Sequence, residues 1–196
     1  MQWAIGLETF LLVDDPWRIF LTTDHPNGAP FTSYPHLIRL LMDKTFRNDV
    51  LSTIHPEAQK MTTLASIDRE YTLNEIAIMT RAGAAKLIGL KDRGGLSAGN
   101  FADITVYTDN ANREAMFEKP DYVFKDGQLV VVDGKVVSTK WGTVHTMKPD
   151  YDASVEVGLK EYFDKYLTMK LGNFKISDDE IIEDGRNTLS VHPLVS

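Results

Sequence analysis

Three side chains that could do chemistry, Asp24, His25 and Asn27, stand close together in the stretch LTTDHPNGAP at residues 21–30. A carboxylate such as that of Asp24 can bind a divalent cation and take a proton from a water bound to that cation. The same stretch is rich in Asp, Asn, Gly and Pro, which are typical of tight turns. The residues alone therefore leave two interpretations open, a turn or the rim of an active site.

The segments around this stretch favour an α/β arrangement. Residues 4–13 are mostly apolar and favour a buried helix, and residues 17–22 (WRIFLT) are rich in aromatic and β-branched residues and favour a short buried strand. Asp24 would then follow the C-terminal end of a buried strand, where parallel α/β barrels build their active sites. The first 20 residues carry three acidic residues and no basic n-region, so they do not form a signal peptide. They resemble the interior of a longer protein.

The middle of the chain has helical periodicity. Apolar residues recur with helical spacing at 34–48, and a second helical piece is expected at 57–65. Thr72 and Glu75 have the spacing of a capping box, in which each side chain satisfies a backbone donor at a helix start. We expect this helix to run from about 73 to 88 and to stop at Gly89.

The periodicity changes after the helices. Strands are expected at 102–107, 122–124, 129–132 and 136–138. Asp-Gly pairs separate the last three strands and are typical of tight hairpin turns, so residues 96–145 indicate a small antiparallel β unit. A helix at 152–170 and a strand at 174–177 are expected beyond it, with Trp141, Tyr151 and the aromatic residues of this helix in a core.

Composition excludes several classes of function. The 196 residues carry a net charge of −7, which disfavours nucleic acid and anionic membranes as partners. No stretch approaches the roughly 18 apolar residues that a membrane span needs. The absence of cysteine excludes disulfides and thiolate metal sites and fits a reducing compartment such as the cytoplasm.

The histidines and one serine show no catalytic spacing. No two of the five histidines have the H-x-H or H-E-x-x-H spacing that places two imidazoles on one metal from a single element. Each is therefore expected to be a surface or capping residue. Residues 95–99 match the G-x-S-x-G pattern, but a helix precedes them and a strand follows, the reverse of a nucleophile elbow. Ser97 is not expected to be a nucleophile.

Two longer motifs resemble the amidohydrolase superfamily. Residues 84–90 (AAKLIGL) and 94–106 (GGLSAGNFADITV) resemble the family's closing helix and the strand that follows it, and residues 131–137 (VVDGKVV) resemble its terminal hairpin. More narrowly, TTDHPNGAPFTSYP, with WAIGLE and LLVDDPWR before it, is similar to the A-subunit family of formylmethanofuran dehydrogenases.

This resemblance implies a fold and a division of the chain. The fold class is α/β: the C-terminal fragment of a metal-dependent (β/α)8 barrel, a small antiparallel β-sandwich unit and an α-helical tail. Residues 1–92 would hold the last strand and helices of the barrel, residues 93–150 the β-sandwich unit and residues 151–196 the C-terminal extension.

The resemblance also implies a function on the C–N bond of an N-formyl group, in formylmethanofuran synthesis or hydrolysis within one-carbon metabolism and methanogenesis. Asp24 would be both a catalytic residue and a ligand of a binuclear zinc centre, and His25 and Asn27 would line the substrate pocket. The family's H-x-H motif, bridging lysine and later histidines are expected upstream of Trp17 and are not in this chain. The fragment is therefore expected to bind no zinc and to be inactive alone.

Partners follow from the same resemblance. The chain is expected to bind other subunits of a formylmethanofuran dehydrogenase-type complex, and to self-associate through unpaired strand edges. It is expected to bind neither nucleic acid nor membrane. Two alternatives remain at this point: another amidohydrolase, of dihydroorotase or aminoacylase type, and a non-catalytic module for the assembly of subunits.

Overall fold

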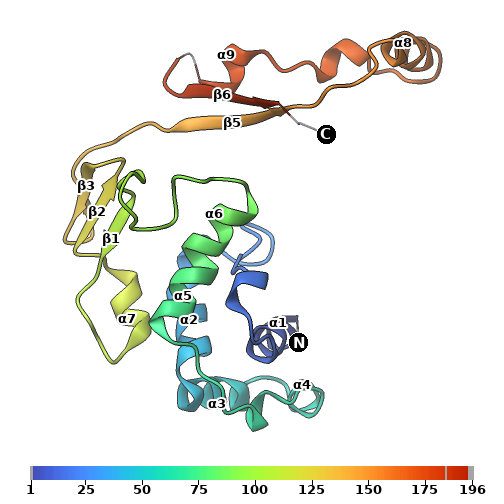
Figure 1. Cartoon of the computed structure of the whole chain (residues 1–196). Helices are drawn as coiled ribbons and strands as arrows, with labels where there is room; N and C mark the ends of the chain where they lie inside the picture. Colours follow the sequence, from blue (N-terminus) through green and yellow to red (C-terminus); the bar gives the residue numbers. More distant parts are fainter. Residues whose placement is uncertain (1, 184, 194–196) are drawn as a thin grey trace. The chain divides into compact units, whose positions relative to one another are not determined.

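The chain forms two compact units, Met1–Thr139 and Lys140–Ser196. The structure, a computed structural model, describes residues 2–183 and 185–193 and is mixed α/β (Figure 1). No helix among the described residues has both the length and the apolar character that a membrane crossing requires. The division predicted at residues 92 and 150 stays a prediction.

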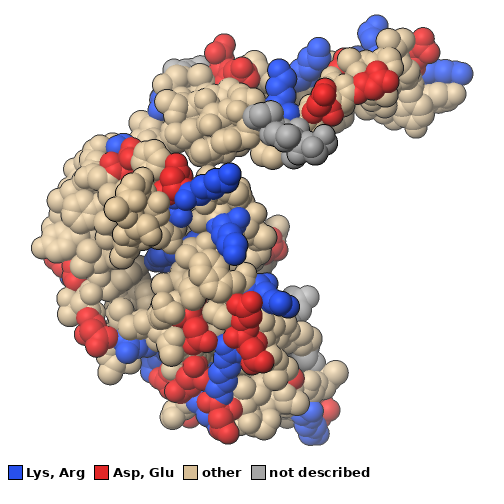
Figure 2. Space-filling view, viewed as in Figure 1, with Lys and Arg blue, Asp and Glu red and all other residues tan. Residues whose placement is uncertain are grey.

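The first unit consists of helices followed by a small sheet. Its helical elements are α1 (Gln2–Leu12), η1 (Pro16–Arg18), η2 (Phe31–Ser33), α2 (Tyr34–Met42), α3 (Lys44–Thr53), α4 (Pro56–Lys60), η3 (Leu64–Ser66), α5 (Leu73–Ala77), η4 (Ile78–Ala82), α6 (Gly83–Leu87) and α7 (Arg113–Glu118). Its strands are β1 (Ile104–Val106), β2 (Tyr122–Lys125), β3 (Gln128–Val132) and β4 (Lys135–Val136). Acidic and basic side chains are interspersed over the visible face of this unit (Figure 2).

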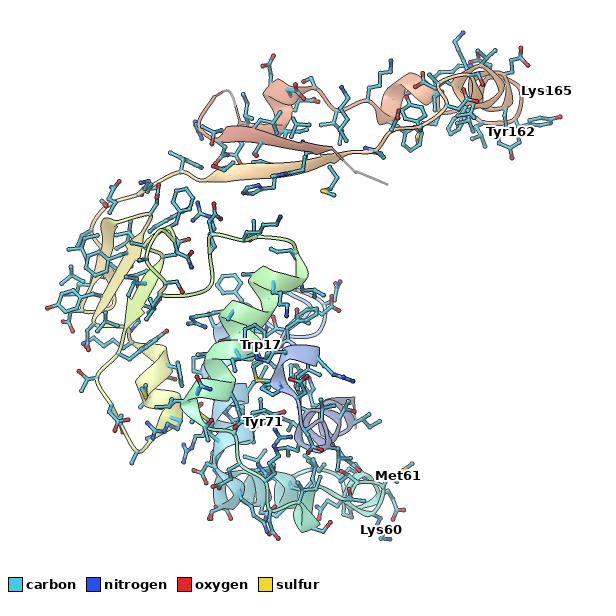
Figure 3. All side chains as sticks on the ribbon, viewed as in Figure 1. Trp17, Lys60, Met61, Tyr71, Tyr162 and Lys165 are labelled. Atoms are coloured by element: carbon cyan, nitrogen blue, oxygen red, sulfur yellow. The ribbon has the colours of Figure 1, made fainter. Side chains whose placement is uncertain are left out.

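The core of the first unit lies among its helices. Side chains of α1 and α2 pack with those of η3, α5 and η4, and Leu41 and Met79 are fully buried. Tyr71 lies among these helices (Figure 3), and its backbone N–H donates to the carbonyl of Leu41 over 3.0 Å. Its hydroxyl donates to the carbonyl of Phe10, and burial raises the pKa of Tyr71. This contact ties the segment before α5 to α1.

Two of the predicted elements at the start of the chain are wrong in extent. The helix predicted at 34–48 is two helices, because Asp43 adopts an extended backbone and its carboxylate accepts the N–H of Phe46 over 2.9 Å as the cap of α3. The strand predicted at 17–22 begins as the 3-10 turn η1, where Asp15 caps the backbone N–H of Trp17. Residues 19–24 follow η1 and form no strand pairing with any described residue.

The helix predicted at 73–88 is confirmed as the consecutive elements α5, η4 and α6. The capping box is present: the Thr72 hydroxyl accepts the N–H of Glu75 over 3.3 Å, and the Glu75 carboxylate accepts the N–H of Thr72 over 2.8 Å. One π-helical turn, η4, interrupts the α-helical pattern. Gly89 ends the helix with a φ of 79°, a left-handed conformation that costs glycine little.

We expect Thr72→Ala to lower the free energy of unfolding by about 0.5–2 kcal/mol, because the variant leaves a helix N-terminal donor without its acceptor. Thr72→Ser keeps the hydroxyl and should recover most of the loss. Urea unfolding followed by circular dichroism measures both. Equal losses in the two variants would show that the methyl group, and not the cap, matters.

The antiparallel β unit predicted from the Asp-Gly pairs is confirmed between residues 104 and 136. Four strands pair in the order β1-β2-β3-β4, all antiparallel. Asp126-Gly127 and Asp133-Gly134 form the two hairpin turns, and all four residues have positive φ, as a type I′ turn requires. The short helix α7 between β1 and β2 was not predicted.

The second unit pairs two strands that are far apart in the sequence. β5 (Thr143–Lys148) and β6 (Thr188–Pro193) are parallel, and α8 (Val155–Tyr166), η5 (Leu171–Phe174) and α9 (Asp178–Ile181) connect them. The strand predicted at 174–177 is wrong, since these residues end η5 and lead into α9.

None of the described residues of the second unit is buried. Trp141, Tyr151 and Tyr162 are all about half exposed or more, so their predicted place in a core is wrong. Tyr162 and Lys165 lie on α8 (Figure 3). This helix contacts the short 3-10 helix η5, where Phe163 packs edge to face on Phe174 with ring centroids 5.5 Å apart.

Candidate functional site

The candidate site is a tight turn at the end of an extended arm. In the arm, residues 19–24, burial alternates: Leu21 and Thr23 are buried whereas Thr22 and Asp24 are exposed. Alternate burial is the pattern of a strand with one face on a core. The arm therefore has the side-chain pattern of a strand, although no described residue pairs with it.

Backbone hydrogen bonds close the turn. The N–H of Gly28 donates to the carbonyl of Asp24 and the N–H of Ala29 donates to that of Thr23, each over 2.9 Å. A Cβ at position 28 would stand 2.6 Å from the Thr23 carbonyl oxygen, so only glycine fits there. Asp24 has a φ of 50°, a left-handed conformation that Asp and Asn adopt more readily than most residues. The turn interpretation is therefore confirmed.

The structure brings Asp24, His25 and Asn27 together in this turn, and all three are exposed. The His25 ring packs edge-on against Phe31, with ring centroids 4.8 Å apart. The roles predicted for the three residues stay predictions. The hydrogen bonds that close the turn use the backbone carbonyl of Asp24, whereas its side chain is exposed to solvent.

A cavity of about 260 Å³ borders the arm at Leu21. Its lining residues are Leu21, Tyr34, Pro35, Ile38, Thr80, Arg81, Tyr107 and Phe117. The lining is mainly apolar, and Arg81, which donates to the hydroxyl of Thr80 over 2.7 Å, is its one charged residue. Asp24 is not part of this lining, so the cavity and the turn are separate features.

The described residues fit a metal ion only in part. They contain no group of three or more histidine, aspartate or glutamate side chains placed to hold a metal. Asp24, as an exposed carboxylate at the end of the arm, could supply one ligand of the kind that divalent ions accept. A complete binuclear set would need further ligands from outside the described residues.

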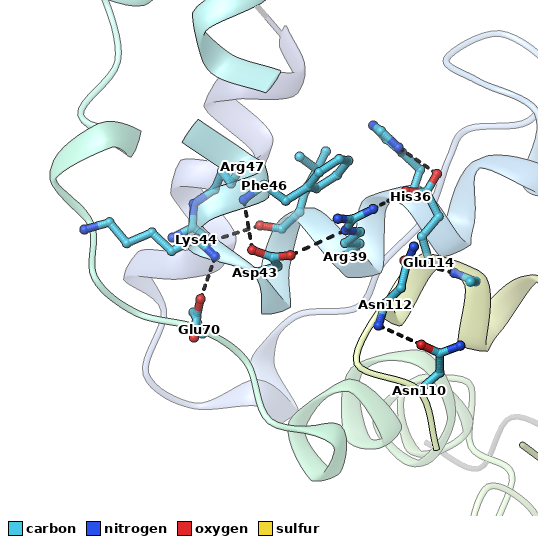
Figure 4. A network of polar contacts seen from close by, with 12 residues as sticks. His36, Arg39, Asp43, Lys44, Phe46, Arg47, Glu70, Asn110, Asn112 and Glu114 are labelled. Atoms are coloured by element: carbon cyan, nitrogen blue, oxygen red, sulfur yellow. Dashed lines mark hydrogen bonds and ion pairs between the residues drawn. The ribbon is translucent and has the colours of Figure 1, made fainter. Parts of the chain in front are cut away.

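A network of polar contacts holds α2, which follows the turn, against α7 (Figure 4). The Glu114 carboxylate faces the His36 ring at 3.0 Å and the Arg39 guanidinium at 3.5 Å. Arg39 also reaches Asp43, the cap of α3, at 3.5 Å. His36 therefore has a structural partner, the Glu114 carboxylate.

Three more histidines have polar partners in the structure. His55 caps α4, and its ring accepts the N–H of Glu57 over 3.2 Å, which confirms its predicted capping role. His145 and His192 lie 2.9 Å apart, measured from Nδ1 to Nε2. No motif in the sequence indicates this pair, because the two residues belong to different strands and only the pairing of β5 with β6 brings them together.

Asp103, from the ADITV motif, has a structural role. Its carboxylate accepts the N–H of Asp126 over 2.8 Å and forms an ion pair with Arg93. Burial raises the pKa of Asp103, but these contacts outweigh it and hold the pKa below its usual value. Asp103 thus ties the glycine-rich turn to the β2–β3 hairpin. Ser97 lies exposed in that turn, with a helix before it and a strand after it.

Comparison with known proteins finds relatives with similar sequences. The chain is 43% identical over 178 residues to the A-subunit of the formyltransferase/hydrolase complex Fhc of Methylorubrum extorquens, covering 91% of this chain and 32% of that protein. It is 40% identical over 191 residues to the protein FwdA of Methanocaldococcus jannaschii, covering 91% of this chain and 34% of that protein. The chain thus spans about one third of the length of these relatives.

The fold has a solved counterpart. The crystal structure of the formyltransferase/hydrolase complex FhcABCD of Methylorubrum extorquens with methylofuran contains a chain that matches the whole of this one with a TM-score of 0.84 and 39% identity. The match covers 35% of that chain. These findings confirm the resemblance inferred from the sequence motifs. The model of the amidohydrolase family matches residues 2–138, and the chain belongs to the amidohydrolase family.

Proposed function

We propose that this chain is the C-terminal part of a metal-dependent amidohydrolase-like subunit that acts on the C–N bond of an N-formyl group. The observation that carries the proposal is the position of Asp24, an exposed carboxylate at the end of a strand-like arm, in a chain 43% identical to part of a formyltransferase/hydrolase complex. In this proposal the arm is the last strand of a (β/α)8 barrel and residues 93–150 belong to a β-sandwich.

Three residues of the turn have a proposed role. The Asp24 carboxylate accepts the proton of the attacking water and delivers it to the leaving nitrogen, as general acid–base catalysis requires. His25 and Asn27 border the substrate on the same turn. A bound pair of zinc ions would supply Lewis-acid activation of water and of the formyl oxygen. The isolated chain, which offers one carboxylate to such a centre, would have no activity.

The proposal is tested with a chimera in which this chain replaces the matching segment of the Methylorubrum Fhc A-subunit. We expect the chimeric complex to keep the N-formyl hydrolysis of the natural complex within about tenfold, and the isolated chain to show none. Release of formate measures activity, and copurification of the other Fhc subunits shows that the chimera has assembled. An assembled complex without activity, or formate release by the isolated chain, would contradict the proposal. Activity on a cyclic imide or an N-acetyl amino acid alone would instead favour a dihydroorotase- or aminoacylase-like enzyme.

A second function, in assembly, is favoured by the exposed face of α8. On one face of this helix, Val155, Leu159, Tyr162 and Tyr166 are all at least 45% exposed. Apolar side chains that a domain leaves uncovered mark contact surfaces. We propose that the second unit docks other subunits of a formylmethanofuran dehydrogenase-type complex. Self-association of the isolated chain and its cytoplasmic location stay predictions.

A further inference from the structure

Two histidines of the second unit face each other across a pair of parallel strands. His145 lies in the middle of β5 and His192 near the end of β6, 47 residues further along the chain. Nδ1 of His145 is 2.9 Å from Nε2 of His192, and the ring planes differ by 23°. The ring centroids are 5.2 Å apart, so the rings meet through these nitrogens at their edges and do not overlap face to face.

The strand pairing places both histidines on one face of the ladder. Six consecutive residue pairs link β5 to β6, and on this face the Thr143 and Thr188 hydroxyls lie 2.8 Å apart. Ser190 pairs with His145, and its hydroxyl is 3.2 Å from Nε2 of His192. The pairing of the two strands therefore fixes the positions of the backbone atoms that carry the two imidazole side chains. Both side chains are exposed to solvent.

A thioether sulfur, which is a soft ligand, lies on the same face. Met147 is two residues after His145 on β5 and pairs in register with His192. It is 58% exposed, although methionine is an apolar residue. Imidazole nitrogens suit copper, nickel and zinc ions, and a thioether sulfur prefers copper, most strongly as Cu⁺ and only as a weak ligand of Cu²⁺. The site thus presents two nitrogens, a sulfur and a hydroxyl, and no carboxylate of the kind that calcium and magnesium require.

The distance between the nitrogens is compatible with binding to one ion. Two nitrogens bound at about 2.0–2.1 Å are about 2.9 Å apart in neighbouring positions of a square-planar ion, and about 3.3 Å apart at a tetrahedral ion. The two rings must turn so that both lone pairs point at the same ion. His145 has one polar partner among the described residues, the His192 ring itself, so a metal replaces that one contact.

We propose that His145 and His192 form a binding site for one divalent transition-metal ion of the copper–nickel–zinc class, with Met147 beside it. Both imidazoles bind in the neutral form, His145 through Nδ1 and His192 through Nε2, and each keeps its proton on the other ring nitrogen. Chelation ties together two strands that are distant in the sequence. The ion therefore stabilises the folded second unit over the unfolded chain, in which the two histidines are far apart.

Titration of the untagged 196-residue chain with Cu²⁺, Ni²⁺ and Zn²⁺ tests the proposal, because an affinity tag would itself bind these ions. We expect one ion per chain for at least Cu²⁺, and an affinity at least about tenfold lower in His145→Gln and in His192→Gln. The matched control is His55→Asn, which removes another exposed histidine but keeps a side chain that caps α4 well. It should bind as the unaltered chain does.

A second measurement does not depend on the variants folding. In the unaltered chain, substoichiometric Cu²⁺ should broaden the ring proton signals of His145 and His192 in an NMR spectrum before those of His36 and His55. Equal broadening of all histidines, no binding at all, or unchanged affinity in both glutamine variants would overturn the proposal. Loss of copper affinity in Met147→Leu with unchanged zinc affinity would support the thioether as the ligand that selects copper.

Discussion

Arg47→Ala is expected to lower the free energy of unfolding by about 3–5 kcal/mol. Arg47 is 1% exposed, and its guanidinium donates to the carbonyls of Leu40, Ile67 and Arg69 over 2.9, 3.0 and 3.1 Å. Alanine would leave one buried and two partly buried acceptors without this donor and would create a cavity beside α2 and α3. Because domains are stable by only about 5–15 kcal/mol, this single change takes a large share of the total.

Two variants separate the hydrogen bonds from the charge. Arg47→Lys keeps a cation of similar length but not the planar fork that reaches three carbonyls, so we expect it to lose about 1–3 kcal/mol. Arg18→Ala removes an exposed arginine whose ion pair with Asp15 lies at the surface, and should change stability by less than about 1 kcal/mol. Urea unfolding measures all three. Equal effects at positions 47 and 18 would show that burial of Arg47 contributes nothing.

Local signals in the sequence predicted local structure well. The Thr72–Glu75 capping box and the two Asp-Gly turns appear in the structure because each depends on residues within four positions of one another. The break between α2 and α3 was missed although it is also local. The apolar periodicity runs across Asp43, and only the capping bond from its carboxylate to the N–H of Phe46 shows that a new helix begins there.

Features that depend on distant residues were not predictable. The pairing of β5 with β6, and with it the His145–His192 contact, joins segments 45 residues apart or more. The buried position of Arg47 likewise depends on the carbonyls of Ile67 and Arg69, which come from a separate segment. In the candidate site, the residue types indicated both possible chemistry and a tight turn, because the stretch is rich in Asp, Asn, Gly and Pro. The sequence also placed the turn after a strand, but the 3-10 turn η1 at the start of that segment and the absence of strand pairing among the described residues required the structure.

In the chimeric Fhc complex, Asp24→Asn is expected to lower kcat for N-formyl hydrolysis by about 10²–10⁴-fold. Asparagine has nearly the same shape and accepts the left-handed backbone that Asp24 adopts at a φ of 50°. The bonds that close the turn use backbone atoms of Thr23 and Asp24, which the substitution keeps. The variant therefore removes the negative charge and the proton acceptor while the turn remains. Zinc content should fall in parallel if the carboxylate is also a ligand.

The matched control is Asp14→Asn, which removes one charge from an exposed aspartate ten residues earlier and should leave kcat unchanged. Asp24→Gly separates the two interpretations of the turn, because glycine adopts positive φ more readily than aspartate and should not weaken the turn. If Asp24 only shapes the turn, the asparagine and glycine variants should both stay active. If its carboxylate carries the proton, both should lose activity although their thermal unfolding is unchanged. Activity retained in both variants, with full zinc content, would therefore contradict the proposed role of Asp24.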